Sequence, residues 1–346
     1  MKILLGMSPV GGHLAGIKYG LKKLGIESDL VYYKNNKYNM PSDMIIWKNE
    51  SKIKKIISMY DFFKFANNYY DVIHFVFGSS FFMFPKHFTF LDLPFISKDI
   101  KIFTTFNGCD IRKKSIMRKI DTQSACYDKN CGKGICGFFY DKIKAIKVKQ
   151  FVKHSQKTFV TTPDLKLFSP NSEILFQPKH TFYDYDYIGI SNNKKIKIVH
   201  APSNTTIKGT NEIINACEKL KNRVELVLVQ NMTNTEALKI YKEADIIIDQ
   251  LKVGWYGGFA VEAMRMGKPV IAYISDISLS FIDDEVKNDL PIINANVNNI
   301  YNVLKELVNE REKLKYFSEK SYEYVNKYHD PIKIASRLYQ NYIEDN

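Results

Sequence analysis

The sequence contains no long apolar stretch. Across its 346 residues, no uninterrupted apolar run reaches the roughly 18 residues that a membrane-spanning helix needs. The first ten residues hold only a very short apolar run, which is broken at Gly6 and Pro9 and is unlike the apolar core of a secretory signal. We therefore expect a cytoplasmic protein that is soluble or, at most, peripheral on the inner face of the cytoplasmic membrane.

The sequence also lacks low-complexity tracts, and apolar residues make up 45% of it, as is typical of a globular protein. Because 346 residues exceed the usual size of a single core, we expect two domains. A polar, glycine-containing segment around residues 184–193 indicates the linker between them. The predicted domains are residues 1–188 and 189–325, with a terminal helix in 326–346 that can cross back to the first domain.

Cysteine is scarce, and its distribution is uneven. Four of the five cysteines fall within one short segment, whereas Cys217 lies alone on an apolar helix face. Cytoplasmic proteins rarely keep disulfides, so the cluster indicates either a structural zinc site or free thiols in a loop. The spacing is not that of a standard zinc knuckle. The candidate zinc ligands are Cys109, Cys126, Cys131 and Cys136.

Acidic residues are scarce in the first half of the chain. Residues 1–190 hold 29 Lys and Arg against 16 Asp and Glu, so this half carries the whole net charge of +13. Such a half suits an anionic partner such as a phospholipid surface, a lipid phosphate or an acidic glycan. A lysine-rich solvated surface would give the same counts. Nucleic acid is not expected, because no known binding module is present.

Strand and helix patterns alternate along the chain. Apolar runs predict strands at residues 2–7, 29–33, 71–77, 101–106, 195–200, 224–229, 245–248 and 269–273. Amphipathic patterns predict helices at residues 11–24, 210–220, 235–243 and 258–266, the second of them with Thr210 as N-cap. This alternation predicts an α/β protein with parallel sheets, which bind ligands beyond the carboxyl ends of their strands.

Four blocks carry a resemblance to a known family. They are 10–12 (Val-Gly-Gly), 105–112 (Thr-Phe-Asn-Gly-Cys-Asp-Ile-Arg), 207–209 (Ile-Lys-Gly) and 256–264 (Tyr-Gly-Gly-Phe-Ala-Val-Glu-Ala-Met). In this order the chain resembles GT-B-fold glycosyltransferases of the large family-4-like group, which transfer sugars from nucleotide sugars with retention of configuration. The resemblance implies two Rossmann-like domains whose parallel sheets face each other across a cleft.

Lys208 and Glu262 are the main donor-site candidates. Lys208 lies between a strand and a helix, where its ammonium can reach a diphosphate at the helix N-terminus. A solvent-facing lysine is the alternative. Glu262 lies in an almost wholly apolar helix, so a partner must satisfy it. The resemblance implies phosphate binding by Lys208 and ribose binding by Glu262; a structural salt bridge would also satisfy the carboxylate.

Glycines precede both candidate helix starts. Gly257 and Gly258, like Gly11 and Gly12, leave backbone amides open to a phosphate or sugar, although ordinary tight turns also use such pairs. His13 follows directly and is expected either to touch a substrate or to lie on the helix surface. The full set of candidate donor-binding residues is Gly11, Gly12, Ser203, Asn204, Lys208, Tyr256, Gly257, Gly258 and Glu262.

Three positions depart from the family pattern. Gly254 stands where relatives commonly carry a sugar-contacting glutamate, Asn107 where they often carry a histidine, and Ser203 where they often carry an arginine. The pocket is therefore either rebuilt for another sugar, with Asn204 and Trp255 contributing, or weakened. We favour rebuilding, because Lys208, Glu262 and the glycines are all present.

The resemblance implies front-face transfer without a protein nucleophile and without a required cofactor or metal, so that catalysis is positioning and stabilisation of the leaving diphosphate. The candidates for orienting the acceptor hydroxyl are Asn107, Asp110 and His74, although Asp110 is also a plausible helix cap.

The expected partners are a nucleotide sugar and a glycan or lipid-linked acceptor. We expect the first domain to bind the acceptor. Two features suit a membrane interface: basic clusters at 112–119 and 142–153, and a segment between 81 and 90 with five phenylalanines and one methionine (Phe81, Phe82, Met83, Phe84, Phe88 and Phe90) around Lys86 and His87. A packed aromatic core with solvated lysines is the alternative. Two other functions stay open: a nucleotide-sugar epimerase of the same fold, or a catalytically weakened protein that binds membranes or anionic glycans.

Overall fold

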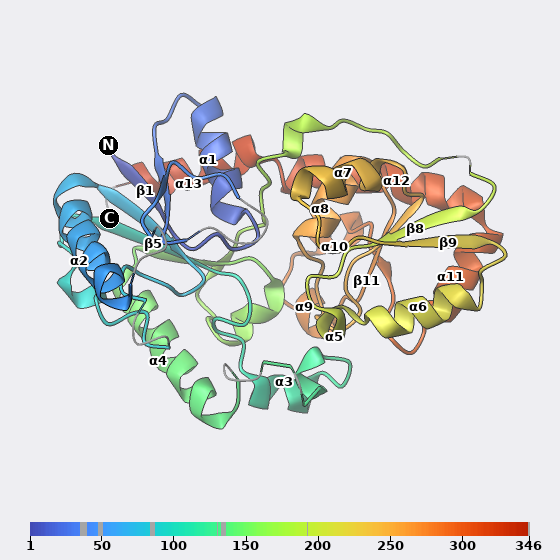
Figure 1. The fold of residues 1–346 in the computed structure, drawn as a ribbon, viewed down its shortest axis with the longest axis horizontal. Helices are drawn as coiled ribbons and strands as arrows, with labels where there is room; N and C mark the ends of the chain where they lie inside the picture. Colours follow the sequence, from blue (N-terminus) through green and yellow to red (C-terminus); the bar gives the residue numbers. More distant parts are fainter. Residues whose placement is uncertain are drawn as a thin grey trace. The chain divides into compact units, whose positions relative to one another are not determined.

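The computed structural model describes residues 1–34, 40–47, 51–83, 87–129, 131–132, 136–191 and 193–344. The chain divides into two compact units, each an α/β layer structure (Figure 1). Unit 1 comprises Met1–Ser115, Gly134–His180 and Pro331–Asn346, and unit 2 comprises Ile116–Lys133 and Thr181–Asp330. Neither unit is one continuous stretch of sequence.

Unit 1 is built on a seven-stranded sheet in which every described pair of strands is parallel. Its order is β3 (Met44–Ile45), β2 (Asp29–Tyr32), β1 (Ile3–Met7), β4 (Val72–Val76), β5 (Lys101–Phe106), β6 (Lys157–Val160) and β7 (Glu173–Ile174). The chain moves outward from β1 in one direction and then in the other. The strand order therefore reverses between β1 and β4, which is where such sheets bind ligands.

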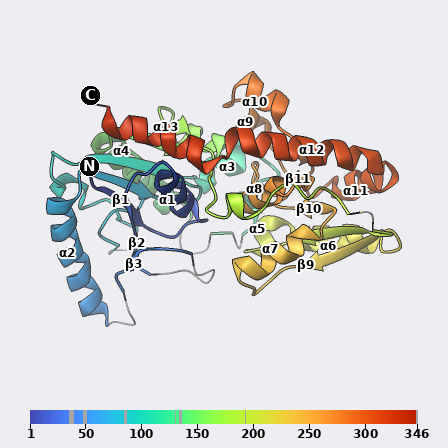
Figure 2. The same cartoon turned by 90° about the horizontal axis from the view of Figure 1, so that it is seen from above.

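Helices cover both faces of this sheet (Figure 2). On one face, α1 (His13–Lys23) packs on α13 (Pro331–Ile343), so closely that a Cβ at Gly20 would lie 2.6 Å from the Cβ of Ala335. On the other face lie α2 (Lys52–Tyr69) and α4 (Phe138–His154). Aromatic rings of α2 pack on Phe81, an aromatic ring of α4 packs on Phe75 of β4, and Phe75 and Phe81 pack on each other. The shorter elements are α3 (Lys114–Ile120), η1 (Leu93–Phe95), η2 (Ala125–Tyr127), η3 (Pro163–Leu167) and η4 (Phe182–Asp184).

Unit 2 is built on a five-stranded parallel sheet. Its order is β12 (Ile293–Asn294), β11 (Val270–Ala272), β10 (Ile246–Ile248), β8 (Ile196–His200) and β9 (Val224–Leu228). Its helices are α5 (Thr205–Lys208), α6 (Thr210–Glu218), α7 (Asn234–Lys242), α8 (Gly258–Arg265), α9 (Asp276–Leu279), α10 (Asp284–Asp289), α11 (Ile300–Asn309) and α12 (Arg311–Tyr328). Isoleucines of β8 and β10 pack with α6 and α11 in one core.

The predicted strands and helices agree with these elements to within about two residues, and β5 agrees at both ends. One detail differs: the N-cap of α6 is Gly209, and Thr210 is the first helical residue. Its hydroxyl lies 2.9 Å from Nε2 of the buried His200, so a tertiary contact holds the side chain that a cap would have used.

The boundaries of the units lie at other residues than the predicted domain ends, 188 and 325. Residues 181–189 fold with unit 2, because Arg265 Nε donates to the carbonyl of Phe182 at 2.9 Å and Lys268 Nζ to that of Gly189 at 2.6 Å. Nor does the sequence pattern reveal that Ile116–Lys133 folds with unit 2. No helix in the described part of the chain has the length and apolar character to span a membrane.

Candidate functional site

Two loops of unit 2 follow neighbouring strands. Residues 201–204 follow β8 and lead into α5, and residues 249–257 follow β10 and lead into α8. Since β8 and β10 pair in parallel, both loops leave the same edge of the sheet, and the strand order reverses between these two strands. This is the point at which an open α/β sheet binds a ligand.

Lys208 ends the short helix α5. Asn204 caps this helix through its Oδ1 atom, which accepts from the N–H of Ile207 at 3.0 Å. Gly209 then has a φ of 73°, and a Cβ there would lie 3.1 Å from the Cβ of Leu251. A glycine is therefore required for the turn that places Lys208 beside the loop after β10.

The ammonium of Lys208 forms an ion pair with Oδ1 of Asp249. Asp249 is fully buried at the end of β10, and its Oδ2 atom accepts a hydrogen bond of 2.5 Å from the N–H of Gly257. The predicted phosphate-binding lysine is thus 8% exposed and paired with a carboxylate, rather than solvent-facing. The pair ties the two loops together at the carboxyl edge of the sheet.

His200, the last residue of β8, supports these loops from below. Its Nδ1 atom lies 2.7 Å from the carbonyl oxygen of Ile248, and its Nε2 atom shares a hydrogen bond with Thr210. Burial lowers the pKa of His200 to about 4, so the ring is neutral near pH 7. It acts as a structural bridge between β8, β10 and α6.

Gly257 and Gly258 begin α8, and no side chain caps this helix. A Cβ at Gly257 would lie 3.2 Å from Oδ2 of Asp249, so the glycine permits the approach of the carboxylate. Its N–H, which the sequence analysis leaves open to a phosphate, instead donates to Asp249. That part of the prediction is wrong, because the buried Asp249 carboxylate already accepts the hydrogen bond of this N–H group.

Glu262 lies on α8, four residues after Gly258, and is 9% exposed. The ring of Phe259, one turn earlier on the same helix, lies 5.8 Å below Nζ of Lys208. Residues three apart share a helix face. Burial is the main cause that raises the pKa of Tyr185, and the charges of Asp184 and Glu262 raise it further. Glu262 therefore lies near the Tyr185 phenol. Phe259 thus brings the first turn of α8 next to Lys208. That Lys208 and Glu262 bind one donor, with the ribose on Glu262, stays a prediction.

Tyr256 does not face a ligand. It is fully buried, and its hydroxyl lies 2.8 Å from the hydroxyl of Tyr324 and 2.8 Å from Nε2 of His329. Burial raises its pKa well above the usual value. The expectation that Tyr256 binds the donor is wrong, because Tyr324 of α12 and His329, which follows α12, give its hydroxyl two partners inside the fold. Ser203 and Asn204 are exposed in the loop after β8.

A segment from the N-terminal half of the sequence completes this edge of unit 2. The N–H of Ala125 donates to the carbonyl of Lys252 at 2.7 Å, and the hydroxyl of Tyr273 donates to Oδ1 of Asp121 at 2.9 Å. Gly254 has a φ of 77°, and a Cβ there would lie 2.8 Å from Oγ of Ser275 and 3.7 Å from Oδ2 of Asp121. A carboxylate therefore stands beside Gly254, supplied by residue 121.

Sequence reasoning missed Asp249, Asp121 and Tyr273. A signal existed for Asp249, since a lone carboxylate directly follows the buried Ile246–Ile248 strand. No local pattern links Asp121 to Gly254, because the two are brought together only by the packing of the Ile116–Lys133 segment on unit 2.

The glycine loop of unit 1 follows β1. Gly11 and Gly12 have φ values of 56° and 69°, as L side chains rarely do. The carbonyl of Gly11 accepts hydrogen bonds from Nε2 of Gln177 at 2.6 Å and from Nζ of Lys179 at 2.9 Å. The loop is thus held in place by residues that follow β7, at the point where the strand order reverses.

His13 is the first residue of α1 and is fully buried. Within the described residues, neither ring nitrogen has a hydrogen-bond partner. Burial, and to a lesser extent Lys179, lowers its pKa to about 3. The ring is therefore neutral, and it is not on the helix surface, which was one of the two expectations.

His74 cannot orient an acceptor. It lies in the middle of β4 and is fully buried. Its Nδ1 atom shares a hydrogen bond of 2.5 Å with the hydroxyl of Tyr342, and its Nε2 atom one of 2.7 Å with Thr105. The catalytic prediction for His74 is wrong, because a core network between β4, β5 and α13 uses both nitrogens.

Asp110 and Asn107 shape the turn after β5. Asp110 is buried and accepts a hydrogen bond of 2.6 Å from the N–H of Gly108, while burial raises its pKa and Lys147 opposes that rise. Oδ1 of Asn107 accepts from the N–H of Phe77 at 3.1 Å, and Phe77 has an unusual φ of 60°. Asp110 thus closes the turn with N–H groups that precede it, whereas a cap of the following helix would accept from N–H groups that come after it. Asn107 stays partly exposed at the edge of the sheet.

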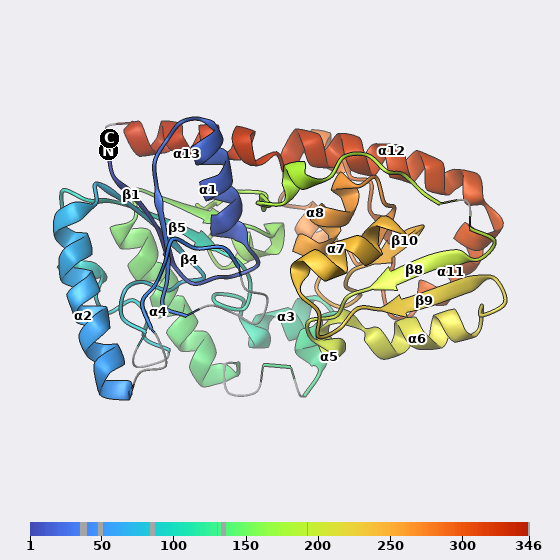
Figure 3. The ribbon, with the colours of Figure 1, turned by 45° about the horizontal axis from the view of Figure 1, so that its top comes forward.

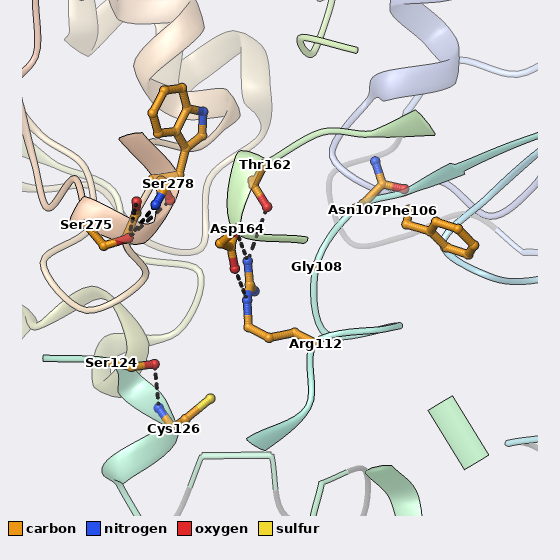
Figure 4. A network of polar contacts seen from close by, with 12 residues as sticks. Phe106, Asn107, Gly108, Arg112, Ser124, Cys126, Thr162, Asp164, Ser275 and Ser278 are labelled. Carbon is orange, nitrogen blue, oxygen red and sulfur yellow. Dashed lines mark hydrogen bonds and ion pairs between the residues drawn. The ribbon is translucent and has the colours of Figure 1, made fainter. Parts of the chain in front are cut away.

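Part of the predicted basic cluster is internal. Figure 4 shows Arg112 turned toward Asp164 and Thr162; its Nε donates to Asp164 at 2.7 Å and its Nη2 to Thr162 at 3.2 Å. Nζ of Lys144 donates to the carbonyl of Arg112 at 2.8 Å. These two cations stabilise the loop after β5 and are not available as a solvated patch.

The four clustered thiols do not assemble a zinc site. Cys109 and Cys136 belong to unit 1, while Cys126 and Cys131 belong to unit 2. Within the described ranges, no three Cys, His, Asp or Glu side chains form a group that could hold a metal. Cys136 accepts a hydrogen bond of 3.4 Å from Lys144. Cys109, Cys136 and Cys217 are free thiols.

A family model described as "Glycosyl transferases group 1" matches residues 190–324. These residues are similar to the group 1 glycosyl transferases. The match contains all five strands of unit 2 with Lys208, Asp249 and Glu262, so the ion pair described above lies within the matched residues. The match makes the chain a transferase, as expected from the sequence. No curated protein matches the sequence of the whole chain.

The chain as a whole has the GT-B fold. Sucrose-phosphate synthase from Thermosynechococcus elongatus superposes with a TM-score of 0.66 at 13% identity, over 99% of this chain and 98% of that chain. Anabaena HepE in complex with UDP and glucose gives 0.62 at 10% identity, over 98% of each chain. UDP-GlcNAc 2-epimerase from Neisseria meningitidis, bound to UDP-GlcNAc, gives 0.51 at 13% identity, over 99% of each chain. These likenesses establish the fold and leave the substrates of this chain open.

Proposed function

We propose that this chain transfers a sugar from a nucleotide-sugar donor, held by unit 2, to a glycan or lipid-linked acceptor, recognised by unit 1. The observation that carries the proposal is the Lys208–Asp249 ion pair, which joins the loops after β8 and β10 within the residues that match the group 1 glycosyl transferases. A diphosphate bound there meets a lysine whose position is already fixed. Preorganised positive charge of this kind stabilises a leaving group without reorganisation.

The donor diphosphate approaches the N-terminus of α8 and Lys208, and Glu262 receives the ribose hydroxyls. HepE, whose structure contains UDP and glucose, supports a nucleoside diphosphate as the leaving group. We further propose that transfer retains the anomeric configuration and requires no metal ion, so that a chelator leaves the rate unchanged. Pathways of cell-surface polysaccharide or glycoconjugate synthesis use such reactions.

The sugar pocket is rebuilt rather than lost. Gly254 cannot carry a side chain without meeting Ser275, and the Asp121 carboxylate stands next to it. We propose that Asp121 contacts the transferred sugar in place of a side chain at position 254, with Tyr273 holding the carboxylate in position. Asn107 serves the acceptor side of the reaction, and the Gly11–Gly12 loop meets the donor sugar or its diphosphate.

Thermal shift with UDP, GDP, ADP and the corresponding nucleotide sugars tests the proposal. Binding to the folded state raises the melting temperature. The sugar donor that gives the largest shift is then incubated with polyprenyl-phosphate and oligosaccharide acceptors, and NMR identifies the anomer formed. The absence of any shift, together with the absence of donor turnover, would contradict the proposal. A donor epimerised without an acceptor would identify an epimerase instead.

A further inference from the structure

Helix α2 has two apolar faces. One face, formed by Met59, Phe62, Phe63 and Ala66, is buried in unit 1. The other face is formed by Ile53, Ile56, Ile57 and Tyr60, which are 72%, 52%, 54% and 49% exposed. Both sets follow the i, i+3, i+4, i+7 spacing of one helix face, and a helix that packs on one side normally has a polar outer face.

Lysines surround the exposed face. Lys52, Lys54, Lys55 and Lys64 lie on α2, against the single acidic residue Asp61. Nζ of Lys64 lies 4.8 Å from the centre of the Tyr60 ring. Apolar side chains exposed beside lysines, whose stems are themselves apolar, form the pattern by which helices lie in a membrane interface.

The first turn of α4 carries two more exposed aromatic side chains. Phe138 and Phe139 are 74% and 65% exposed, and Nζ of Lys142 lies 4.5 Å from the centre of the Phe138 ring. Helices α2 and α4 both precede strands of one parallel sheet, β4 and β6, and cover the same face of it. Their N-terminal ends therefore point to its carboxyl edge, as Figure 3 shows. Gly11 and Gly12, which follow β1, and Asn107, which follows β5, lie at the same edge.

The predicted aromatic segment has a different role. Phe81 and Phe90 are buried, and Phe81 packs on Phe62 and Phe63 of α2, so they form the core beneath this surface rather than the surface itself. Phe84 and Lys86 lie outside the described residues.

We propose that the exposed face of α2, with the first turn of α4, docks unit 1 on an anionic phospholipid surface. The lysines favour anionic headgroups over a second copy of the chain, since two copies would bring like charges together. Docking would hold the carboxyl edge of the unit 1 sheet close to the lipid headgroups. This last step rests on the proposed function, because it assigns a lipid-linked acceptor to that edge.

Co-sedimentation with phosphatidylglycerol/phosphatidylcholine vesicles (1:1), compared with pure phosphatidylcholine vesicles, tests the docking. Wild-type protein should bind the anionic vesicles, and binding should weaken with salt. The I53Q/I57Q variant should bind about tenfold or more weakly, because two exposed apolar side chains no longer insert. K52Q/K54Q should lose binding to anionic vesicles by about the same factor.

Ile214 and Met232 supply a matched control, since they are 37% and 40% exposed on unit 2. I214Q/M232Q should bind vesicles like the wild type. All four substituted α2 positions are exposed, so the variants should keep the wild-type melting temperature and the wild-type thermal shift with nucleoside diphosphate. A protein that binds vesicles but not nucleotide would refute only the proposed function. Equal vesicle binding by I53Q/I57Q and wild type, or a dimer in light scattering that I53Q/I57Q abolishes, would overturn the docking proposal.

Discussion

The Nζ atom of Lys208 pairs with one carboxylate oxygen of Asp249, and the other oxygen of Asp249 accepts the N–H of Gly257. One buried acidic side chain thus fixes both the cation and the glycine loop that a diphosphate would meet. An incoming ligand finds the lysine already oriented, but it shares that charge with Asp249. The strength of donor binding is therefore set by the pair, not by Lys208 alone.

Replacing Lys208 by Met should abolish the thermal shift with nucleoside diphosphates and should also destabilise the fold. Removing one partner of a buried ion pair leaves a buried charge uncompensated and typically costs about 3–5 kcal/mol. The double variant K208M/D249N should regain most of the unfolding free energy without regaining nucleotide binding. Urea unfolding and thermal shift measure the two effects separately. If K208M binds nucleotide like the wild type, the donor site lies elsewhere.

The carboxylate of Asp121 should affect the sugar and not the nucleotide. Asp121→Asn is expected to keep the thermal shift with the free nucleoside diphosphate and to lower kcat/KM for sugar transfer by about 10- to 100-fold, because a polar contact in the transition state is lost. Lys129→Gln, an exposed change in the same Ile116–Lys133 segment, is the control. Equal losses in both variants would assign Asp121 a purely structural role.

Gly254 should tolerate no side chain. Its φ is 77°, and an added Cβ would approach Oγ of Ser275 to 2.8 Å. Gly254→Ala is expected to cost about 1–3 kcal/mol of unfolding free energy. Gly25→Ala has a similar φ of 75° but no atom within 4 Å of the added Cβ, so it separates backbone strain from crowding. A larger loss at Gly25 than at Gly254 would contradict the crowding argument.

Three buried histidines should make the protein less stable in acid. The pKa falls to about 3 at His13 and His74 and to about 4 at His200, mainly through burial, from an ordinary value of 6.5. The unfolded chain therefore takes up protons first as the pH falls. The stabilising contribution is complete above pH 6.5 and is lost between pH 6.5 and about 3–4.

Each of these histidines should lower the unfolding free energy by about 2 kcal/mol between pH 7.5 and pH 5. Urea unfolding at the two pH values measures the sum. His13→Leu removes one titrating group and, because neither ring nitrogen of His13 has a hydrogen-bond partner in the described structure, no hydrogen bond. Its pH dependence should shrink by one histidine's share; an unchanged dependence would mean that His13 is protonated in the fold.

The contact between α1 and α13 should fail when Gly20 gains a side chain. A Cβ there would collide with the carbonyl of Pro331 and lie 2.6 Å from the Cβ of Ala335. Gly20→Ala should lower the unfolding free energy by about 1–3 kcal/mol and speed hydrogen exchange in α13. Lys23→Ala, an exposed change at the end of the same helix, should do neither.

The elements of this fold could be predicted from local patterns. Strands such as β10 are continuous apolar runs, and helices such as α6 show an apolar face, so the local pattern locates them. The candidate site was predicted in part. Lys208 and Glu262 belong to local blocks, and the structure places both in unit 2 and buries both.

Roles that depend on tertiary contacts could not be predicted in this way. Their places in the sequence predicted a catalytic role for His74 and a ligand contact for Tyr256. In the structure, His74 shares a hydrogen bond with Tyr342 and Tyr256 one with Tyr324, and both side chains are buried in the core. The same limit applies to Asp121, which meets Gly254 across more than a hundred residues of chain. Hydrophobic periodicity also gave no sign that α2 would keep isoleucines exposed.

The chain passes between the two units at four places, after residues 115, 133, 180 and 330. A fragment cut at residue 180 would therefore lose α13 from beneath α1 and would carry along a stretch that belongs to the other half. Exchanging the donor half with that of a relative would require residues 116–133 and 181–330 to be transplanted together. Gene designs for chimaeras or isolated halves should follow these four junctions rather than a single midpoint.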